Sequence, residues 1–244
     1  MQPEEALERL RRLGFAEEEA GVLFAHFADA ERRGKLGHGF SRIEWLERLP
    51  GLSPRARPAK VESRPGFDRW DGRGALGYLT LAAICDDLER EPPDPARVVV
   101  AADCFPTGML GHWVRRLADA GLVAVLTATS PARLGPPGGG PPLVGTNPLA
   151  IGIPSSSGDP VVMDVSMGKV TYGDVLAGSA SPEDLVPFGG DQAHKAFALA
   201  VGLQLLVDSF VEGYGAFLVA ARPDRDPVPD LRRLAVGVRL PGDR

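Results

Sequence analysis

The sequence predicts a mixed α/β fold, in which helices and short strands follow one another along the chain. Residues 77–90 (GYLTLAAICDDLER) place apolar side chains at helical spacing, and residues 193–210 predict a longer apolar helix. Residues 97–102 (RVVVAA) and 161–165 (VVMDV) are short apolar runs typical of buried strands. Because both kinds of segment alternate, an α/β or α+β class is expected.

The N-terminal part of the chain is expected to be helical. Residues 3–33 predict two helices, the first ending at Gly14 and the second carrying one apolar face. Residues 34–39 (GKLGHG) form a glycine-rich turn, and a short helix is expected over residues 41–49. Residues 50–69 are rich in proline and arginine, so an extended segment is expected there.

The remainder of the chain continues the alternation of helices and strands. Further elements are expected as a helix over residues 111–120, a strand over 122–127 and a late strand over 217–220. Residues 131–142 (PARLGPPGGGPP) are the most irregular stretch. They are interpreted either as an interdomain linker or as a loop beside a site, since GTNPLAIGIP follows directly.

Composition restricts the class of protein. Of 244 residues, 44% are hydrophobic and 24% charged, which is typical of a globular chain with one or two domains. The net charge of −5 disfavours a nucleic-acid-binding protein. Cys85 and Cys104 are too few for a disulfide framework, and no metal site is expected from them or from the four histidines. The sequence has no apolar run near the roughly 18 residues of a membrane span, so a cytoplasmic protein is expected.

Residues 72–77 (GRGALG) satisfy the G-x-G-x-x-G pattern of a Rossmann dinucleotide site and precede a helix. That site also requires a buried strand directly before the glycines. Residues 64–71 (RPGFDRWD) show no strand pattern. We therefore predict a flexible turn that begins the helix.

One histidine differs from the others in its surroundings. His26 lies within a predicted helix and His112 begins one, so structural or surface roles are expected for both. His38 lies between two glycines, which let the backbone turn sharply and let a ligand approach the imidazole. From the residues alone, a catalytic proton donor and a simple turn residue are equally good interpretations of His38.

Several segments, in the correct order, resemble motifs of the malate/L-lactate dehydrogenase family. This family lacks a Rossmann fold and includes ureidoglycolate dehydrogenase and cyclic imino acid reductases. The GTNP block of residues 145–148 is the most specific match. The other matches are residues 37–42 (GHGFSR, resembling S-H-G-x-x-R), 71–77 (D-G-x-x-x-x-G), Asp164 (D-x-A-T-S), 189–199 (G-G…H-K-G-x-x-L) and 239–242 (R-x-P-G).

The resemblance implies a non-Rossmann NAD(P)-binding domain with a largely antiparallel sheet, together with a helical domain. The implied arrangement is discontinuous. Residues 1–70 form the N-terminal helical part of one domain, residues 71–190 form the central sheet-containing domain, and residues 191–244 return to the first. Family members are dimers with sites near the subunit interface, so a homodimer is expected.

The resemblance also implies hydride transfer between NADPH or NADH and a small 2-oxo acid or cyclic imine that carries a carboxylate. His38 would give a proton to the substrate oxygen or nitrogen as hydride reaches carbon. Asp164 would orient and stabilise the imidazolium. Arg42 would bind the substrate carboxylate through its planar guanidinium. A role in specialised metabolism is expected.

The matching motifs also supply candidate cofactor contacts. Cofactor binding is one interpretation of these motifs. The alternative for the GTNP residues is a plain tight turn, and the alternative for Lys195 is an exposed lysine at the start of a helix. Residues 131–142 are placed beside the cofactor pocket, because the GTNP block follows them. The expected cofactor-binding residues are Gly108, Gly145, Thr146, Asn147, His194 and Lys195.

The sequence departs from the family motifs at several positions near the expected cofactor. The serine before the catalytic histidine is replaced by Gly37, a histidine by Pro106, and a Thr-Ser pair by Met167 and Gly168. Two alternatives therefore stay open. One is a descendant that has lost the cofactor and uses the histidine and aspartate for cyclisation, isomerisation or elimination. The other is a non-catalytic binding partner.

Overall fold

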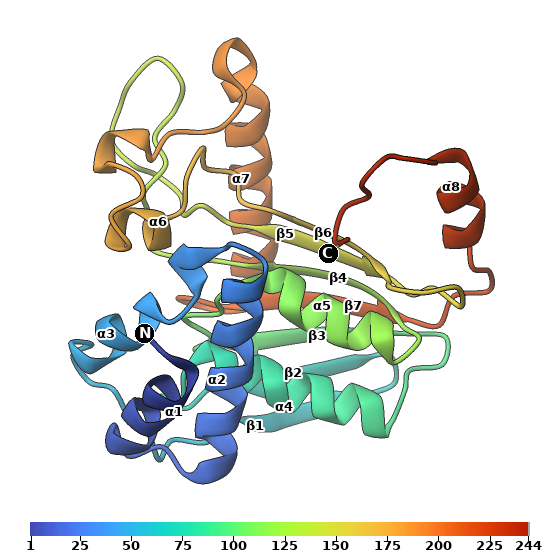
Figure 1. The fold of residues 1–244 in the computed structure, drawn as a ribbon, viewed down its shortest axis with the longest axis horizontal. Coiled ribbons are helices and arrows are strands. Elements are labelled where there is room, and N and C mark those ends of the chain that lie inside the picture. Colours follow the sequence, from blue (N-terminus) through green and yellow to red (C-terminus); the bar gives the residue numbers. More distant parts are fainter. Residues whose placement is uncertain (244) are drawn as a thin grey trace.

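The computed structural model describes residues 1–243, in which a seven-stranded sheet is flanked by helices (Figure 1). Across the sheet the strands lie in the order β1-β2-β3-β7-β4-β5-β6. Their bounds are β1 Ala59–Arg64, β2 Phe67–Asp71, β3 Ala96–Ala102, β4 Val123–Ala128, β5 Leu149–Ile153, β6 Val161–Val165 and β7 Ala216–Ala221.

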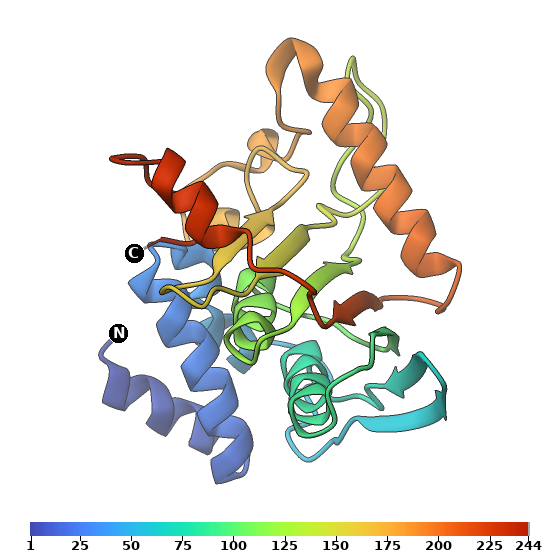
Figure 2. The ribbon, with the colours of Figure 1, turned by 90° about the vertical axis from the view of Figure 1, so that its right-hand side faces the viewer.

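Helices lie on both sides of the sheet, with α4 and α5 on one side and α7 on the other (Figure 2). The α-helices are α1 Pro3–Arg12, α2 Glu17–Arg32, α3 Ser41–Glu47, α4 Gly77–Arg90, α5 Leu110–Asp119, α6 Tyr172–Leu176, α7 Ala193–Asp208 and α8 Val228–Leu234. Three 3₁₀ turns are η1 Leu36–His38, η2 Pro182–Asp184 and η3 Gly190–Gln192.

The sheet is predominantly antiparallel. β7 pairs antiparallel with both β3 and β4, although it is the last strand in the sequence. Within residues 1–243, β2 and β3 form the one parallel pair. This architecture confirms the expected mixed α/β class with a largely antiparallel sheet.

The central strands divide their side chains between two packing layers, because successive side chains of a strand point to opposite faces. Val99 and Leu218 pack with Trp113 in the large core beneath α4 and α5. Val100 belongs to a smaller cluster on the other face, which includes Val207 of α7. The sheet is therefore covered on both sides at its centre.

Most expected elements are confirmed, some with changed ends. The helix predicted over residues 77–90 is α4, and the strand predicted over 161–165 is β6, each with the same bounds. The helix predicted over 193–210 ends at Asp208. The elements β5, α6 and α8 were not expected from the pattern. All seven strands join one sheet, including two that begin before residue 71 and one that lies after residue 190. The three-part domain division stays a prediction.

The interpretation of residues 64–71 as lacking a strand is wrong, because Phe67–Asp71 is β2. The Asp68 side chain is 1% exposed and accepts a hydrogen bond from Ser63 Oγ at 2.6 Å. It also forms ion pairs with Lys60 and Arg97, at 3.6 and 3.3 Å. A buried carboxylate interrupts the apolar alternation by which strands are recognised in a sequence.

The glycines of GRGALG are needed for packing within the chain. A Cβ on Gly72 would lie 2.0 Å from the carbonyl oxygen of Asp103, and one on Gly77 would lie 2.8 Å from the carbonyl carbon of Cys104. The loop after β3 therefore lies against the start of α4, where a Rossmann site would hold phosphate groups. This contact supports a structural turn in spite of the preceding strand.

Asp68→Ala is expected to lower the free energy of unfolding by roughly 3 kcal/mol, because Arg97 and Ser63 would lose their buried partner. Urea denaturation followed by circular dichroism measures the change. The control Glu62→Ala, on β1, removes an exposed ion-pair partner of Arg69. It is expected to lower the free energy of unfolding by less than about 1 kcal/mol. Equal losses in the two variants would contradict this account of β2.

Candidate active site

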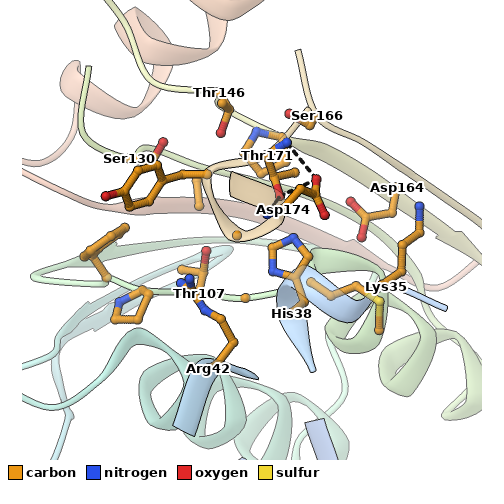
Figure 3. Close-up of a pocket in the computed structure, with 18 of the residues that line it drawn as sticks. Lys35, His38, Arg42, Thr107, Ser130, Thr146, Asp164, Ser166, Thr171 and Asp174 are labelled. Atoms are coloured by element: carbon orange, nitrogen blue, oxygen red, sulfur yellow. Dashed lines mark hydrogen bonds between the residues drawn. The ribbon is translucent and has the colours of Figure 1, made fainter. Parts of the chain in front are cut away.

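A cavity of about 370 Å³ lies where four segments of the chain meet (Figure 3). They are η1 with α3, the loop after β3, the loop after β4, and the segment from the end of β6 to α6. This volume is in the range of small-molecule sites. The polar side chains that line it are Lys35, His38, Arg42, Thr107, Thr129, Ser130, Arg133, Thr146, Asp164, Ser166, Thr171, Tyr172 and Asp174.

His38 ends η1 and projects into this cavity between two tightly packed glycines (Figure 3). A Cβ on Gly37 would lie 2.6 Å from Oδ1 of Asp174, and one on Gly39 would lie 2.1 Å from Oε1 of Glu31. The imidazole Nδ1 is buried without a hydrogen-bond partner. The glycines therefore let the segments that carry Glu31 and Asp174 approach the backbone on either side of the histidine. Because Nδ1 is buried, Nε2 is the accessible ring nitrogen.

The charges around His38 favour the neutral imidazole. Burial lowers the pKa of His38 to about 4, and the positive charges of Arg42 and Lys35 act in the same direction. The carboxylate of Asp174 opposes them and raises this pKa. At neutral pH the imidazole is therefore neutral, and its proton affinity depends on how these nearby charges are balanced.

Arg42 carries a buried guanidinium that lacks an ionic partner among residues 1–243. Its side chain is 8% exposed, and both Nε and Nη1 are buried without a hydrogen-bond acceptor. The guanidinium lies over the Trp45 ring, 4.6 Å from its centroid. Buried N–H donors without acceptors are costly, so this arrangement is suited to an anion that enters the cavity.

Asp164, at the end of β6, lies in the same cavity but is hydrogen-bonded elsewhere. Its Oδ2 accepts the backbone N–H of Gly111 at 2.7 Å, and within residues 1–243 no hydrogen bond joins it to His38. Burial raises the pKa of Asp164, while the Gly111 N–H and the Lys35 charge oppose this shift. The structure brings the aspartate and the histidine together without a direct link, and the orienting role of Asp164 stays a prediction.

The residues expected to bind the cofactor are not all brought to this cavity. Gly108 and Thr146 line it. Asn147 is fully buried, and its amide donates to the Ala200 carbonyl oxygen at 2.9 Å and to Gln204 Oε1 at 3.0 Å. This side chain therefore links the segment before β5 to α7.

Gly108 and Gly145 also permit close packing. A Cβ on Gly108 would lie 2.3 Å from Tyr78 and 2.4 Å from His26. One on Gly145 would lie 2.4 Å from the hydroxyl of Ser130. His26 is buried, and its Nε2 accepts the backbone N–H of Met109 at 3.0 Å. The side chain of His26 thus has a structural role, since it holds the loop that contains Gly108.

A second, shallower depression of about 970 Å³ adjoins the cavity and shares Arg133 with it. It is lined by residues of the 131–142 loop, as well as by Gly189, Gly190 and Ala193 at the start of α7. His194 and Lys195 follow directly and are exposed. The 131–142 loop thus borders both hollows, and Arg133 lies over the Tyr172 ring, 3.4 Å from its centroid.

Several residues of the cavity were not expected from the sequence. Lys35 and Ser130 belong to no recognised motif, and the Ser130 hydroxyl is buried without a partner. Thr171 and Asp174 form a capping box at the start of α6, in which each side chain bonds the other residue's backbone N–H. The T-x-x-D spacing is a helix-start signal that could have located α6, although not its position beside His38.

Comparison with known proteins identifies the family to which this chain is related. The sequence model described as malate/L-lactate dehydrogenase matches residues 4–185. The NADP⁺-dependent (2R)-3-sulfolactate dehydrogenase of Chromohalobacter salexigens is 35% identical over 188 residues, 73% of this chain and 56% of that protein. The Δ1-pyrroline-2-carboxylate/Δ1-piperideine-2-carboxylate reductase of Pseudomonas putida is 29% identical over 233 residues, 84% of this chain and 67% of that protein.

Solved structures share the fold over nearly the whole chain. The Δ1-piperideine-2-carboxylate reductase of Pseudomonas syringae superposes with a TM-score of 0.81 at 24% identity, covering 100% of this chain and 91% of that one. Malate dehydrogenase from Entamoeba histolytica superposes with a TM-score of 0.80 at 21% identity, covering 99% and 85% of the two chains.

The fold is a largely antiparallel α/β fold, and one of its cavities contains a histidine and an unpaired buried arginine. Such a cavity is suited to binding a small anion next to an acid–base group. The chain belongs to the malate/L-lactate dehydrogenase family. It spans 56% of the length of the sulfolactate dehydrogenase that it matches.

Arg42→Met is expected to raise the free energy of unfolding of the ligand-free protein by about 1 kcal/mol, because an apolar side chain replaces a buried unpaired charge. Oxalate, a small dicarboxylate, is expected to raise the melting temperature of the unsubstituted protein and not that of this variant. The control Arg48→Met changes an exposed arginine after the same helix and should keep the oxalate effect. Equal stabilisation of Arg42→Met by oxalate would contradict the anion site.

Proposed function

We propose that this protein is an NAD(P)H-dependent oxidoreductase. It transfers hydride between NADPH or NADH and a small 2-oxo acid or cyclic imine that carries a carboxylate. The single observation that carries the proposal is the placement of His38 and the unpaired Arg42 in one cavity, in a chain of the malate/L-lactate dehydrogenase family. The sulfolactate dehydrogenase and the imino acid reductase named above are relatives whose substrates fit this description.

Arg42 and His38 have separate and linked tasks in the proposed reaction. The guanidinium of Arg42, which lines the cavity, binds the substrate carboxylate through two neighbouring N–H groups on one edge of its planar fork. The bound carboxylate offsets the positive charge that lowers the pKa of His38, so substrate binding raises the proton affinity of the imidazole. The accessible Nε2 then delivers a proton to the substrate oxygen or nitrogen.

The cavity and its neighbouring depression fit a nicotinamide dinucleotide. Phe105, Pro106 and Met109 give the cavity an apolar wall, and the buried Ser130 hydroxyl has no partner and can bond a carboxamide. When bound there, the nicotinamide supplies or accepts the hydride.

The remaining predicted site residues are assigned by whether they line the cavity or adjoin the second depression. Gly108 and Thr146 would contact the nicotinamide end, and Gly145 and Asn147 would hold the shape of that wall. His194 and Lys195 follow the lining residue Ala193, so they would meet the far end of the dinucleotide in the second depression. Asp164, which the resemblance makes the orienting carboxylate of His38, lines the cavity.

We also infer a homodimer. Four apolar side chains of α7 and the turn after it are exposed, from 36 to 60%: Leu199, Leu205, Leu206 and Phe210. Several exposed apolar side chains on one helix and the turn after it are typical of an interface.

Cellular location is proposed on less specific grounds. None of the helices in residues 1–243 is long and apolar enough to cross a membrane. Both cysteines are buried free thiols, which supports a reducing compartment such as the cytoplasm. A role in specialised metabolism stays a prediction.

Fluorescence titration with NADPH and with NADH tests the proposed activity. At least one is expected to bind, and added 2-oxo acids or Δ1-piperideine-2-carboxylate should then oxidise it. His38→Gln is expected to keep cofactor binding and to lower kcat by roughly 100-fold or more, because the proton donor is lost. If the folded protein binds neither nucleotide, the redox proposal is wrong, and the cofactor-free reaction and the non-catalytic binding partner remain as the alternatives.

Light scattering after size exclusion tests the dimer. The protein is expected to have twice its 25.9 kDa chain mass, and Leu205→Glu should give the monomer because a charge enters the proposed interface. The control Leu234→Glu changes an 87% exposed leucine on α8 and should stay dimeric. A monomeric unsubstituted protein would refute this arrangement.

A further inference from the structure

The start of α6 packs against η1 through two glycines that face each other. A Cβ on Gly37 would lie 2.7 Å from the backbone nitrogen of Asp174, and one on Gly173 would lie 2.2 Å from the carbonyl oxygen of Gly37. Side chains at either position would therefore separate the two segments. This contact places the first turn of α6 beside the residue that precedes His38.

Within α6, the carboxylate of Asp174 is fixed by one of its two oxygens. Oδ2 accepts the backbone N–H of Thr171 at 2.9 Å and its hydroxyl at 2.8 Å. Oδ1 makes no hydrogen bond within residues 1–243 and is the atom nearest the Cβ position of Gly37. Figure 3 shows the Asp174 side chain on the same side of the cavity as the His38 ring.

Other charged or titratable groups surround His38, and most are turned to other partners or carry positive charge. Glu31, on α2, accepts the backbone N–H of Phe40 at 2.7 Å. Asp164, on β6, accepts the N–H of Gly111, and His26, on α2, bonds the Met109 backbone. Arg133 and Tyr172 also line the cavity and lie against each other. The cations Lys35 and Arg42 both disfavour a protonated imidazole.

We propose that Asp174 is the positioning carboxylate of His38 in place of Asp164, and that it acts through its charge, since the imidazole Nδ1 has no hydrogen-bond partner within residues 1–243. Its negative charge offsets Lys35 and Arg42, and so stabilises the imidazolium from which a proton passes to the substrate. The inference rests on the proposed reductase function. It assigns Asp174 no contact with the substrate, because its effect is exerted through His38.

The experiment compares three substitutions with a fourth, Asp174→Glu, that keeps the carboxylate. Asp174→Asn removes the charge and keeps a side chain of the same size. Thr171→Ala breaks the capping box and keeps the charge, so it is the matched control for a purely structural effect on α6. Asp164→Asn tests the carboxylate that the family motif favours.

The first readout is the protonation of His38, followed by imidazole NMR between pH 3.5 and 7 in the folded protein without cofactor or substrate. At pH 4 about half of the His38 rings are expected to be protonated. In Asp174→Asn this fraction should fall to about a quarter or less, because a nearby carboxylate is worth roughly a threefold or larger change in proton affinity. Thr171→Ala and Asp164→Asn should remain near one half.

The second readout is the pH profile of kcat/KM for substrate reduction. Above the pKa of His38 the rate falls with the protonated fraction, so Asp174→Asn should be roughly three- to tenfold slower at each pH. Asp174→Glu should restore most of the loss. The cofactor dissociation constant, measured for each variant, separates a loss of cofactor binding from a loss of proton transfer.

Three results would overturn the assignment: an unchanged His38 titration in Asp174→Asn, a shift of equal size in Thr171→Ala, or a larger shift in Asp164→Asn. The NMR titration needs no turnover. A protein that fails to bind NADPH and NADH but shows the expected titrations would therefore refute the reductase and leave the Asp174–His38 coupling intact.

Discussion

The site depends on the insertion of β7 between β3 and β4. At the beginning of β7, the Tyr214 carbonyl oxygen accepts the N–H of Cys104 at 3.0 Å, and the Gly215 carbonyl oxygen accepts the N–H of Thr129 at 2.9 Å. The hydroxyl of Thr129 in turn accepts the Gly215 N–H at 2.9 Å. Tyr214 and Gly215, which lie far along the sequence from β3 and β4, thereby fix the points at which the loops after these two strands leave the sheet. Both loops continue directly into the walls of the cavity.

The polar groups of the cavity illustrate a conflict between stability and function. Arg42 is buried without an ionic partner, and it depresses the pKa of a histidine that the proposed reaction must protonate. In the free protein both features are unfavourable. A bound carboxylate relieves both together, because it provides acceptors for the guanidinium and reduces the positive field at His38. The unliganded cavity is thus arranged to bind an anion, and this arrangement lowers the stability of the free protein.

The sequence predicted elements whose pattern is local. The helix α4 and the strand β6 depend on the spacing of their own apolar residues, and His38 is identified by the glycines on either side. Strand β2 was missed because the charge of Asp68 is neutralised by residues of β1 and β3, which no local pattern reveals. Asn147 belongs to the most specific motif, yet the structure buries it as a link to α7. The proximity of Asp174 to His38 is likewise a tertiary contact between segments far apart in the sequence.

The facing glycines of η1 and α6 have a consequence for how such a site can change in evolution. While α6 occupies its present place, a side chain at position 37 collides with its backbone, and a side chain at position 173 collides with η1. Either substitution becomes tolerable only after the other segment has moved. The effect of a mutation at one position thus depends on the state of the other, so a lineage that acquires this contact cannot regain a serine at position 37 by a single substitution without disturbing α6.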